Sequence, residues 1–135
     1  MPLITWNHEM SVKVKEIDDQ HKKLINVINH LNDAIQAGKG KQVLHETFVE
    51  LVRYAEYHFH TEEKYMKQFG YSGYIPHRVA HDEFVRKVLT HQADLKSGKG
   101  VEPLAIMAFL KVWVVSHIMD MDMQYSETFI KGGLR

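Results

Sequence analysis

Apolar residues recur at steps of three and four in four separate stretches of the chain, which is the spacing of one face of an α-helix. The first stretch stops at "AGKGK", where Gly38 suits a helix C-terminus, and the second stops at Gly70. The third follows "YSGYIP", whose Pro76 suits a first helical turn, and the fourth opens at Pro103. We therefore expect helices over residues 12–37, 41–69, 76–96 and 103–130.

No stretch alternates between apolar and polar residues as a half-buried strand would, and the linkers between the helical stretches are short. Four long helices with short connections predict an all-α fold, an antiparallel up-down-up-down four-helix bundle. The length of 135 residues suits one domain, residues 1–135, with one core. The residues before the first helix would form an N-terminal arm, on which Trp6 packs across the bundle.

Each of the four apolar stripes is interrupted by histidine, and two of them also by a carboxylate. A single inward histidine is usually a core residue that hydrogen-bonds to a neighbour. Several histidines together with carboxylates would need many partners in a small core, whereas metal coordination satisfies them at once. The pattern therefore predicts a metal site. Its candidate residues are His21, His58, Glu62, His77, His81, His117 and one aspartate of "HIMDMD", residues 117–122.

The other histidines of the ten fit the metal site poorly. We expect His8, His30, His45 and His60 at the surface, because they fall off the stripes. His91 is on a stripe, but it lies ten residues from His81, about 15 Å along a helix, and we place it in the core or at a bundle end. The methionines are expected to pack rather than to ligate.

The two halves of the chain match each other at an offset of 60 residues, which relates His21 to His81 and Tyr65 to Tyr125. We infer two helical hairpins related by a pseudo-twofold axis, with the metal site near that axis.

The repeat bears on which aspartate of "HIMDMD" serves the site. On a regular helix Asp120 stays near the face of His117, while Asp122, five residues on, is rotated by about 140°. The repeat instead matches Asp122 with Glu62, although Glu62 follows its histidine, His58, by only four residues. The helical spacing and the repeat are both satisfied if a π-bulge accommodates one extra residue between 117 and 122. They are also satisfied if the Asp122 side chain reaches across a regular helix. We expect Asp122 in the site, a local distortion before it, and Asp120 on the solvent side or beside the ligands.

Five imidazoles and two carboxylates are too many donors for one ion and suit two ions bridged by the carboxylates. Nitrogen and oxygen donors without sulfur favour iron, then zinc or manganese.

Four motifs, "DDQH" at 18–21, "HFHTEEKYM" at 58–66, "HRVAH" at 77–81 and "HIMDMD" followed by Tyr125, resemble the bacterial hemerythrin (bacteriohemerythrin) family. The resemblance covers nearly the whole chain and implies a cofactor of two non-haem iron ions with carboxylate bridges and an oxo or hydroxo bridge. It implies that one iron is held by His77, His81 and His117, that the other is held by His21 and His58, and that Glu62 and Asp122 bridge them.

Three further residues follow from the same resemblance. Trp113 and Val114 resemble the apolar wall of the family's oxygen site, and Tyr125, like Tyr65, is a candidate hydrogen-bond donor to the ligands. Plain core packing explains each of them equally well.

The resemblance implies reversible dioxygen binding, for storage, delivery or sensing, rather than an enzyme. A di-iron enzyme of the peroxidase or nitric-oxide-reducing type is one alternative, and metal storage or a structural zinc site is another. Seven ligands with an open position suit a closed structural site poorly. An oxygen-consuming enzyme would be a natural recipient of the oxygen.

The amino-acid composition limits the kinds of partner and location that we expect for this protein. The 17 basic and 17 acidic residues cancel without a basic block, so we expect no nucleic-acid or anionic-membrane partner. The absence of cysteine excludes disulfides and thiolate sites and fits a cytoplasmic protein. We see no signal peptide, and the run "FLKVWVVSHIM" is too short to span a bilayer, so we expect no membrane insertion. The charge balance and the lack of an obvious extra apolar face favour a monomer.

Overall fold

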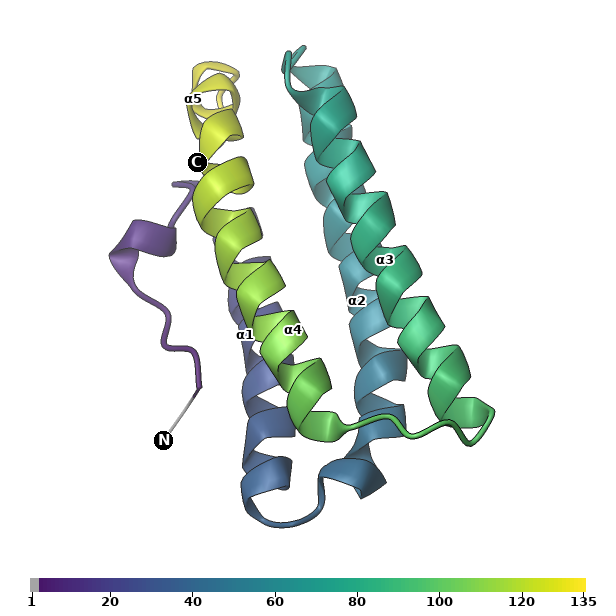
Figure 1. Ribbon diagram of the computed structural model, residues 1–135. Coiled ribbons are helices and arrows are strands. Elements are labelled where there is room, and N and C mark those ends of the chain that lie inside the picture. The colour runs from purple at the N-terminus through teal and green to yellow at the C-terminus, as the bar shows by residue number, and fades with distance from the viewer. Residues whose placement is uncertain (1–2) are drawn as a thin grey trace.

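The computed structural model describes residues 3–135 as an all-α four-helix bundle (Figure 1). Its elements are η1 (His8–Met10), α1 (Lys15–Gln36), α2 (Gly40–Gln68), α3 (Tyr74–Lys96), α4 (Pro103–Ser116), η2 (His117–Asp122) and α5 (Met123–Lys131). The last three follow one another without a break, so they make the fourth rod of the bundle. The short loops alternate between the two ends, so successive rods run antiparallel. The described residues contain no strand, and the predicted fold class is confirmed.

The first helix begins at Lys15, three residues later than the apolar pattern indicates, whereas the other helix ends lie within two residues of expectation. Val12 and Val14 are buried, but they belong to the arm, and Val14 is extended. Asp18 in the first turn explains this start. Its carboxylate accepts hydrogen bonds from the Val12 amide at 2.9 Å and from the Ser11 hydroxyl at 2.6 Å. These bonds fix the arm in a non-helical path, so the helix does not extend further towards the N-terminus.

The N-terminal arm lies along the outside of the bundle, and three contacts fasten it in addition to those of Asp18. Asn29 of α1 exchanges two hydrogen bonds of 2.9 Å with the backbone of Ile4, and Ser126 of α5 donates to the Val12 carbonyl at 2.6 Å. Trp6 is half-buried against the core, and the Lys22 ammonium lies 5.2 Å from the centre of its ring. The expected packing of Trp6 is confirmed.

The apolar core consists of two clusters with polar side chains between them. The smaller cluster contains Val12, Val14, Ile17, Met66, Tyr125 and Phe129, and the larger one fills the remaining length of the bundle. His21 lies between Ile17 of the smaller cluster and Leu24 of the larger one. The site therefore sits in the interior of the bundle, sealed at both ends by apolar side chains.

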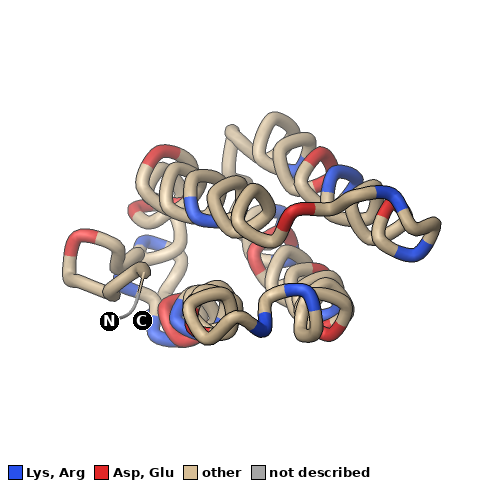
Figure 2. Tube along the Cα trace, turned by 60° about the horizontal axis from the view of Figure 1, so that its bottom comes forward, with Lys and Arg blue, Asp and Glu red and all other residues tan. Residues whose placement is uncertain are grey.

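Two surface features differ from what the sequence alone suggests. Leu104, Val112 and Met119 are exposed, so several large apolar side chains of the fourth rod lie at the surface. By length and composition the helix Pro103–Lys131 could also cross a membrane, since an 18-residue window in it has a mean hydropathy of 1.6, although core helices of soluble proteins meet the same criteria. Basic and acidic residues are interspersed along the helices (Figure 2).

Asp18 supplies a test of the fold. Replacing it with alanine leaves the Val12 amide and the Ser11 hydroxyl without their acceptor, so Asp18→Ala should lower the free energy of unfolding by about 1–2 kcal/mol. Thermal and denaturant unfolding of the metal-free protein measure this. The matched control is Asp19→Ala, which removes an exposed carboxylate that forms a surface ion pair with Lys15 and should leave the midpoint unchanged. Equal effects of the two substitutions would contradict the capping role of Asp18.

Candidate metal centre

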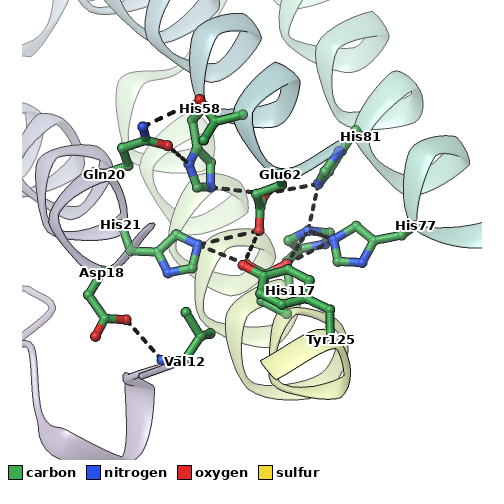
Figure 3. A network of polar contacts seen from close by, with 12 residues as sticks. Val12, Asp18, Gln20, His21, His58, Glu62, His77, His81, His117 and Tyr125 are labelled. Atoms are coloured by element: carbon green, nitrogen blue, oxygen red, sulfur yellow. Dashed lines mark hydrogen bonds and ion pairs between the residues drawn. The ribbon is translucent and has the colours of Figure 1, made fainter. Parts of the chain in front are cut away.

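Seven side chains from all four rods converge in the middle of the bundle (Figure 3). Their possible ligand atoms form two groups, within each of which all atoms lie within 4.8 Å of one another. The three-histidine group contains His77, His81 and His117 with Glu62 and Asp122, and the two-histidine group contains His21 and His58 with the same two carboxylates. Every one of these residues is buried. The structure thus brings together all seven residues that the sequence nominated.

Helical spacing places most of these side chains directly. His58 and Glu62 lie one turn apart on α2, and His77 and His81 lie one turn apart on α3, so each pair shares a face. α1 contributes His21 from its core-facing stripe.

The fourth rod needs a local change of helix geometry to contribute two residues. Residues His117–Asp122 form a π-helix, which confirms the expected bulge in this segment. A π-helix has i→i+5 hydrogen bonds, so residues five apart come to one face. Asp122 is accordingly fully buried, and its Oδ1 lies 3.0 Å from Nε2 of His117, whereas Asp120 is exposed. The structure therefore selects Asp122 over Asp120.

The three-histidine group has the spacing of ligands around one ion. The Nε2 atom of His117 lies 3.1 Å from Nε2 of His77 and 3.0 Å from Nε2 of His81. Imidazole nitrogens lie about 2.1 Å from a transition-metal ion, so two of them at right angles around it are about 3.0 Å apart. Asp122 Oδ1 adds an oxygen 2.9 Å from His77 Nε2.

Both carboxylates reach histidines of both groups. Asp122 turns Oδ1 towards His77 and His117 and places Oδ2 2.9 Å from Nε2 of His21. Glu62 Oε1 lies 3.0 Å from Nε2 of His58 and 3.4 Å from Nε2 of His81. Each carboxylate therefore lies between the two groups and belongs to both of them.

Unpaired buried atoms test whether ions fit here. Within the described part of the chain, both ring nitrogens of His21, Oε1 of Glu62 and both oxygens of Asp122 are buried without a hydrogen-bond partner. Their close approaches to one another lack hydrogen-bond geometry. Unpaired buried polar atoms of this kind cost several kcal/mol, and bound cations between them would remove the cost. The donor set therefore fits metal ions with nitrogen and oxygen ligands, which includes iron.

Two polar residues that the sequence did not nominate orient the histidines. His58 donates from Nδ1 to the amide oxygen of Gln20 at 2.7 Å, and His81 donates from Nδ1 to a carboxylate oxygen of Glu63 at 2.8 Å. Each bond leaves the Nε2 lone pair of that ring facing the site. Both residues are sequence neighbours of a candidate ligand, Gln20 of His21 and Glu63 of Glu62, which is a signal that sequence reasoning could have used.

The two candidate tyrosines behave differently. Tyr125 is fully buried, and its hydroxyl donates a hydrogen bond to Oε2 of Glu62 while its ring stacks against His77. Burial, together with the negative charges of Asp122 and Glu62, raises the pKa of Tyr125 well above 10, so it stays a protonated donor. Tyr65 instead donates to Glu16, which with partial burial raises its pKa to about 12, and it does not contact the site.

Aromatic rings cover the three-histidine group. Trp113 stacks on His117 with ring centres 4.4 Å apart, and Phe59 stacks on His81 at 3.8 Å. Phe59 was not nominated by the sequence, although it directly follows His58. Val114 is buried in the larger core cluster. A groove of about 280 Å³ between α3 and α4, lined by Val112, Trp113 and Met121 among others, reaches His117.

The remaining histidines lie where the sequence placed them. His8, His30, His45 and His60 are exposed, and His91 is half-buried beside Phe109, outside both groups.

Without metal, the site holds opposite charges together. Burial opposes the charging of His21 and His81, but their carboxylate neighbours outweigh it and raise both pKa values to about 9. For His21 these neighbours are Asp122 and Glu62, and for His81 they are Glu62 and Glu63. Burial lowers the pKa of His58, so this ring is neutral. The pKa values of Glu62 and Asp122 lie below their usual range, because the histidines outweigh burial, so both remain ionised.

Comparison with known proteins agrees with this geometry. A sequence profile described as "Hemerythrin HHE cation binding domain" matches residues 12–128. Bacteriohemerythrin of Pseudomonas aeruginosa is 33% identical over 125 residues, which cover 93% of this chain and 80% of that protein. Myohemerythrin of Sipunculus nudus is 31% identical over 121 residues, covering 89% and 88%. A crystal structure of a wild-type hemerythrin superimposes with a TM-score of 0.87 at 28% identity, covering 94% of this chain and 98% of that one.

The chain therefore belongs to the hemerythrin family. Members of this family are oxygen-binding proteins rather than enzymes.

The choice between the two aspartates can be tested directly. Asp122→Ala removes the carboxylate shared by both groups and should abolish the binding of two ions per chain, as measured by metal analysis after loading with ferrous iron. Asp120→Ala is the matched control from the same helical turn and should bind metal as the parent does. Retention of two ions by Asp122→Ala with their loss in Asp120→Ala would reverse the assignment.

The raised histidine pKa values predict proton release on metal binding. At pH 7 in the metal-free protein His21 and His81 are protonated, and a metal ion must displace these protons. Zinc binding should release about two protons per chain near pH 7, and apparent affinity should rise with pH up to about 9. Calorimetry in buffers of different ionisation enthalpy counts the protons.

The same values set the stability of the metal-free protein. The pKa values of His21 and His81 in the folded protein exceed the ordinary histidine value of about 6.5. Their contribution to the free energy of unfolding is therefore full below pH 6.5 and is lost as pH rises through about 9. If the unfolding midpoint of the metal-free protein does not decrease as pH rises from 6.5 to 9, the charge assignment is contradicted.

Proposed function

We propose that this protein binds dioxygen reversibly at a centre of two non-haem iron ions. The observation that carries the proposal is the division of seven buried donors into two unequal groups that share Glu62 and Asp122. Iron bound in such a pair supplies reversible oxygen-binding chemistry. Membership in the hemerythrin family supports the identity of the metal and of the ligand.

The residues have distinct roles in this proposal. His77, His81 and His117 would hold one iron, His21 and His58 would hold the other, and Glu62 and Asp122 would be shared by both. An oxo or hydroxo group would complete the cofactor. The two-histidine group has one protein ligand fewer, which leaves room for a small ligand at that ion. This inequality is what favours a binding centre over a closed structural site.

The surrounding side chains exclude water and hold one proton. Trp113 and Phe59 cover the histidines, and Val114 belongs to the apolar packing around them. A dry, apolar surrounding limits the access of water and protons, which slows loss of the ferrous state. Tyr125 keeps its proton on the hydroxyl and directs it at Oε2 of Glu62, so it holds this carboxylate in its bridging orientation.

We further propose a cytoplasmic monomer that stores oxygen, senses it, or delivers it to an oxygen-consuming enzyme, without membrane insertion or nucleic-acid binding. The absence of cysteine and the equal numbers of basic and acidic residues support this part of the proposal. The membrane-length helix Pro103–Lys131 carries His117 and Asp122 on its core side, which favours its place in the bundle.

The decisive experiment uses the anaerobic apoprotein loaded with ferrous iron. Admission of oxygen should produce a visible absorption band that disappears when oxygen is removed and returns over several cycles. Asp122→Ala should show no such band. Irreversible oxidation accompanied by turnover of peroxide or nitric oxide would instead favour the di-iron enzyme, and a colourless protein that retains only zinc would refute both.

A further inference from the structure

The two groups of the centre differ in the chemistry of the residues that hold their histidines. In the three-histidine group His81 donates from Nδ1 to Glu63, an anionic acceptor, at 2.8 Å. In the two-histidine group His58 donates from Nδ1 to Gln20, a neutral amide, at 2.7 Å. Nδ1 of His21 is buried without any acceptor among the described residues. Among residues 3–135, therefore, only the three-histidine group has a negatively charged side chain that accepts a hydrogen bond from Nδ1 of one of its rings.

This difference has a direct effect on ligand strength. A carboxylate that accepts the Nδ1 proton draws it away from the ring, which makes the imidazole more basic at Nε2 and a stronger donor to a metal ion. An amide oxygen orients the ring equally well but adds no charge. Hydrogen bonds to ionised acceptors are roughly twice as strong as those between neutral groups.

The surroundings of the two acceptors suit their charges. The Glu63 side chain is 21% exposed, so water still solvates its carboxylate. Gln20 is 5% exposed, and its amide nitrogen donates to the Thr61 hydroxyl at 3.4 Å while Thr61 donates to the Tyr57 carbonyl. The amide at position 20 is thus held by a partner that accepts a hydrogen bond. A carboxylate there would be buried and would lose this contact.

We propose that Glu63 and Gln20 are positioning residues that make the two metal sites unequal, with Glu63 strengthening the three-histidine site through its charge and Gln20 keeping the two-histidine site the weaker one. The stronger site fills first, and the weaker site holds its ion through fewer histidines, neither of which has an anionic acceptor at Nδ1 among the described residues. The inference rests on the proposed assignment of two ions to these groups, but it does not depend on oxygen.

The test is stepwise zinc binding to the metal-free protein, measured by calorimetry, with each affinity corrected for the protons that zinc displaces from His21 and His81. Glu63→Gln keeps an acceptor for His81 and removes only the charge, so it should weaken the first binding step about tenfold and change the second by less than twofold. Glu63→Leu removes charge and acceptor together and should weaken the first step further. Glu56→Gln, which neutralises an exposed carboxylate of the same helix, is the matched control and should change neither step.

The same zinc titration in a His21→Ala background shows which binding step belongs to which group. That substitution disables the two-histidine group, so the step that Glu63→Gln weakens should remain. If Glu63→Gln binds zinc as the parent does and only Glu63→Leu weakens the first step, Glu63 acts by orientation alone and the proposal is overturned. An equal loss in both steps also overturns it.

Gln20→Glu supplies the reciprocal variant. A charge behind His58 should strengthen the second zinc step several-fold and bring the two steps closer together, whereas an unchanged or weakened second step in the folded variant would contradict the proposal.

Because zinc binds no oxygen, the zinc titrations test the inequality of the two sites separately from the proposed oxygen binding. Reversible oxygen binding with unaltered zinc steps would refute the inference alone, and altered zinc steps without oxygen binding would refute the proposed function alone.

Discussion

The burial of two ionised carboxylates in the middle of an apolar bundle is the constraint on which the rest of this structure depends. Glu62 and Asp122 are both 0% exposed, and neither has a lysine or arginine partner among its described contacts. Five histidines supply the compensating groups, and no bundle could hold this many donors facing one another without protons or cations between them. The two apolar clusters above and below keep water out, which makes this electrostatic requirement stronger.

That requirement also explains the irregular part of the fold. A regular helix would rotate Asp122 by about 140° from His117. The fourth rod instead changes to a π-helix over those residues, which brings both to the same site. Poorer helical geometry is the cost of a carboxylate that touches both histidine groups. The distortion is placed where the carboxylate has to reach both groups, and regular helix resumes at Met123.

The second layer of contacts shapes the centre as much as the donors themselves. Gln20, Glu63 and Tyr125 fix ring or carboxylate orientations by hydrogen bonds, while Trp113 and Phe59 fix them by stacking. These contacts are unequal on the two sides of the centre, so two ions bound there would have different surroundings even though they share both bridges.

The sequence by itself determined the class of fold and the donors, because apolar spacing and inward histidines are local consequences of helical periodicity. It also indicated a local distortion before Asp122, because Asp122 follows His117 by five residues whereas its repeat partner Glu62 follows His58 by four. Only the tertiary structure decided which residues stand behind the histidines and how the first helix begins. Gln20 of α1 contacts His58 of α2, and Asp18 binds an arm that is not helical and whose path helical periodicity therefore cannot predict. Such contacts join residues far apart in sequence or outside regular elements, so their partners exist only once the helices have packed.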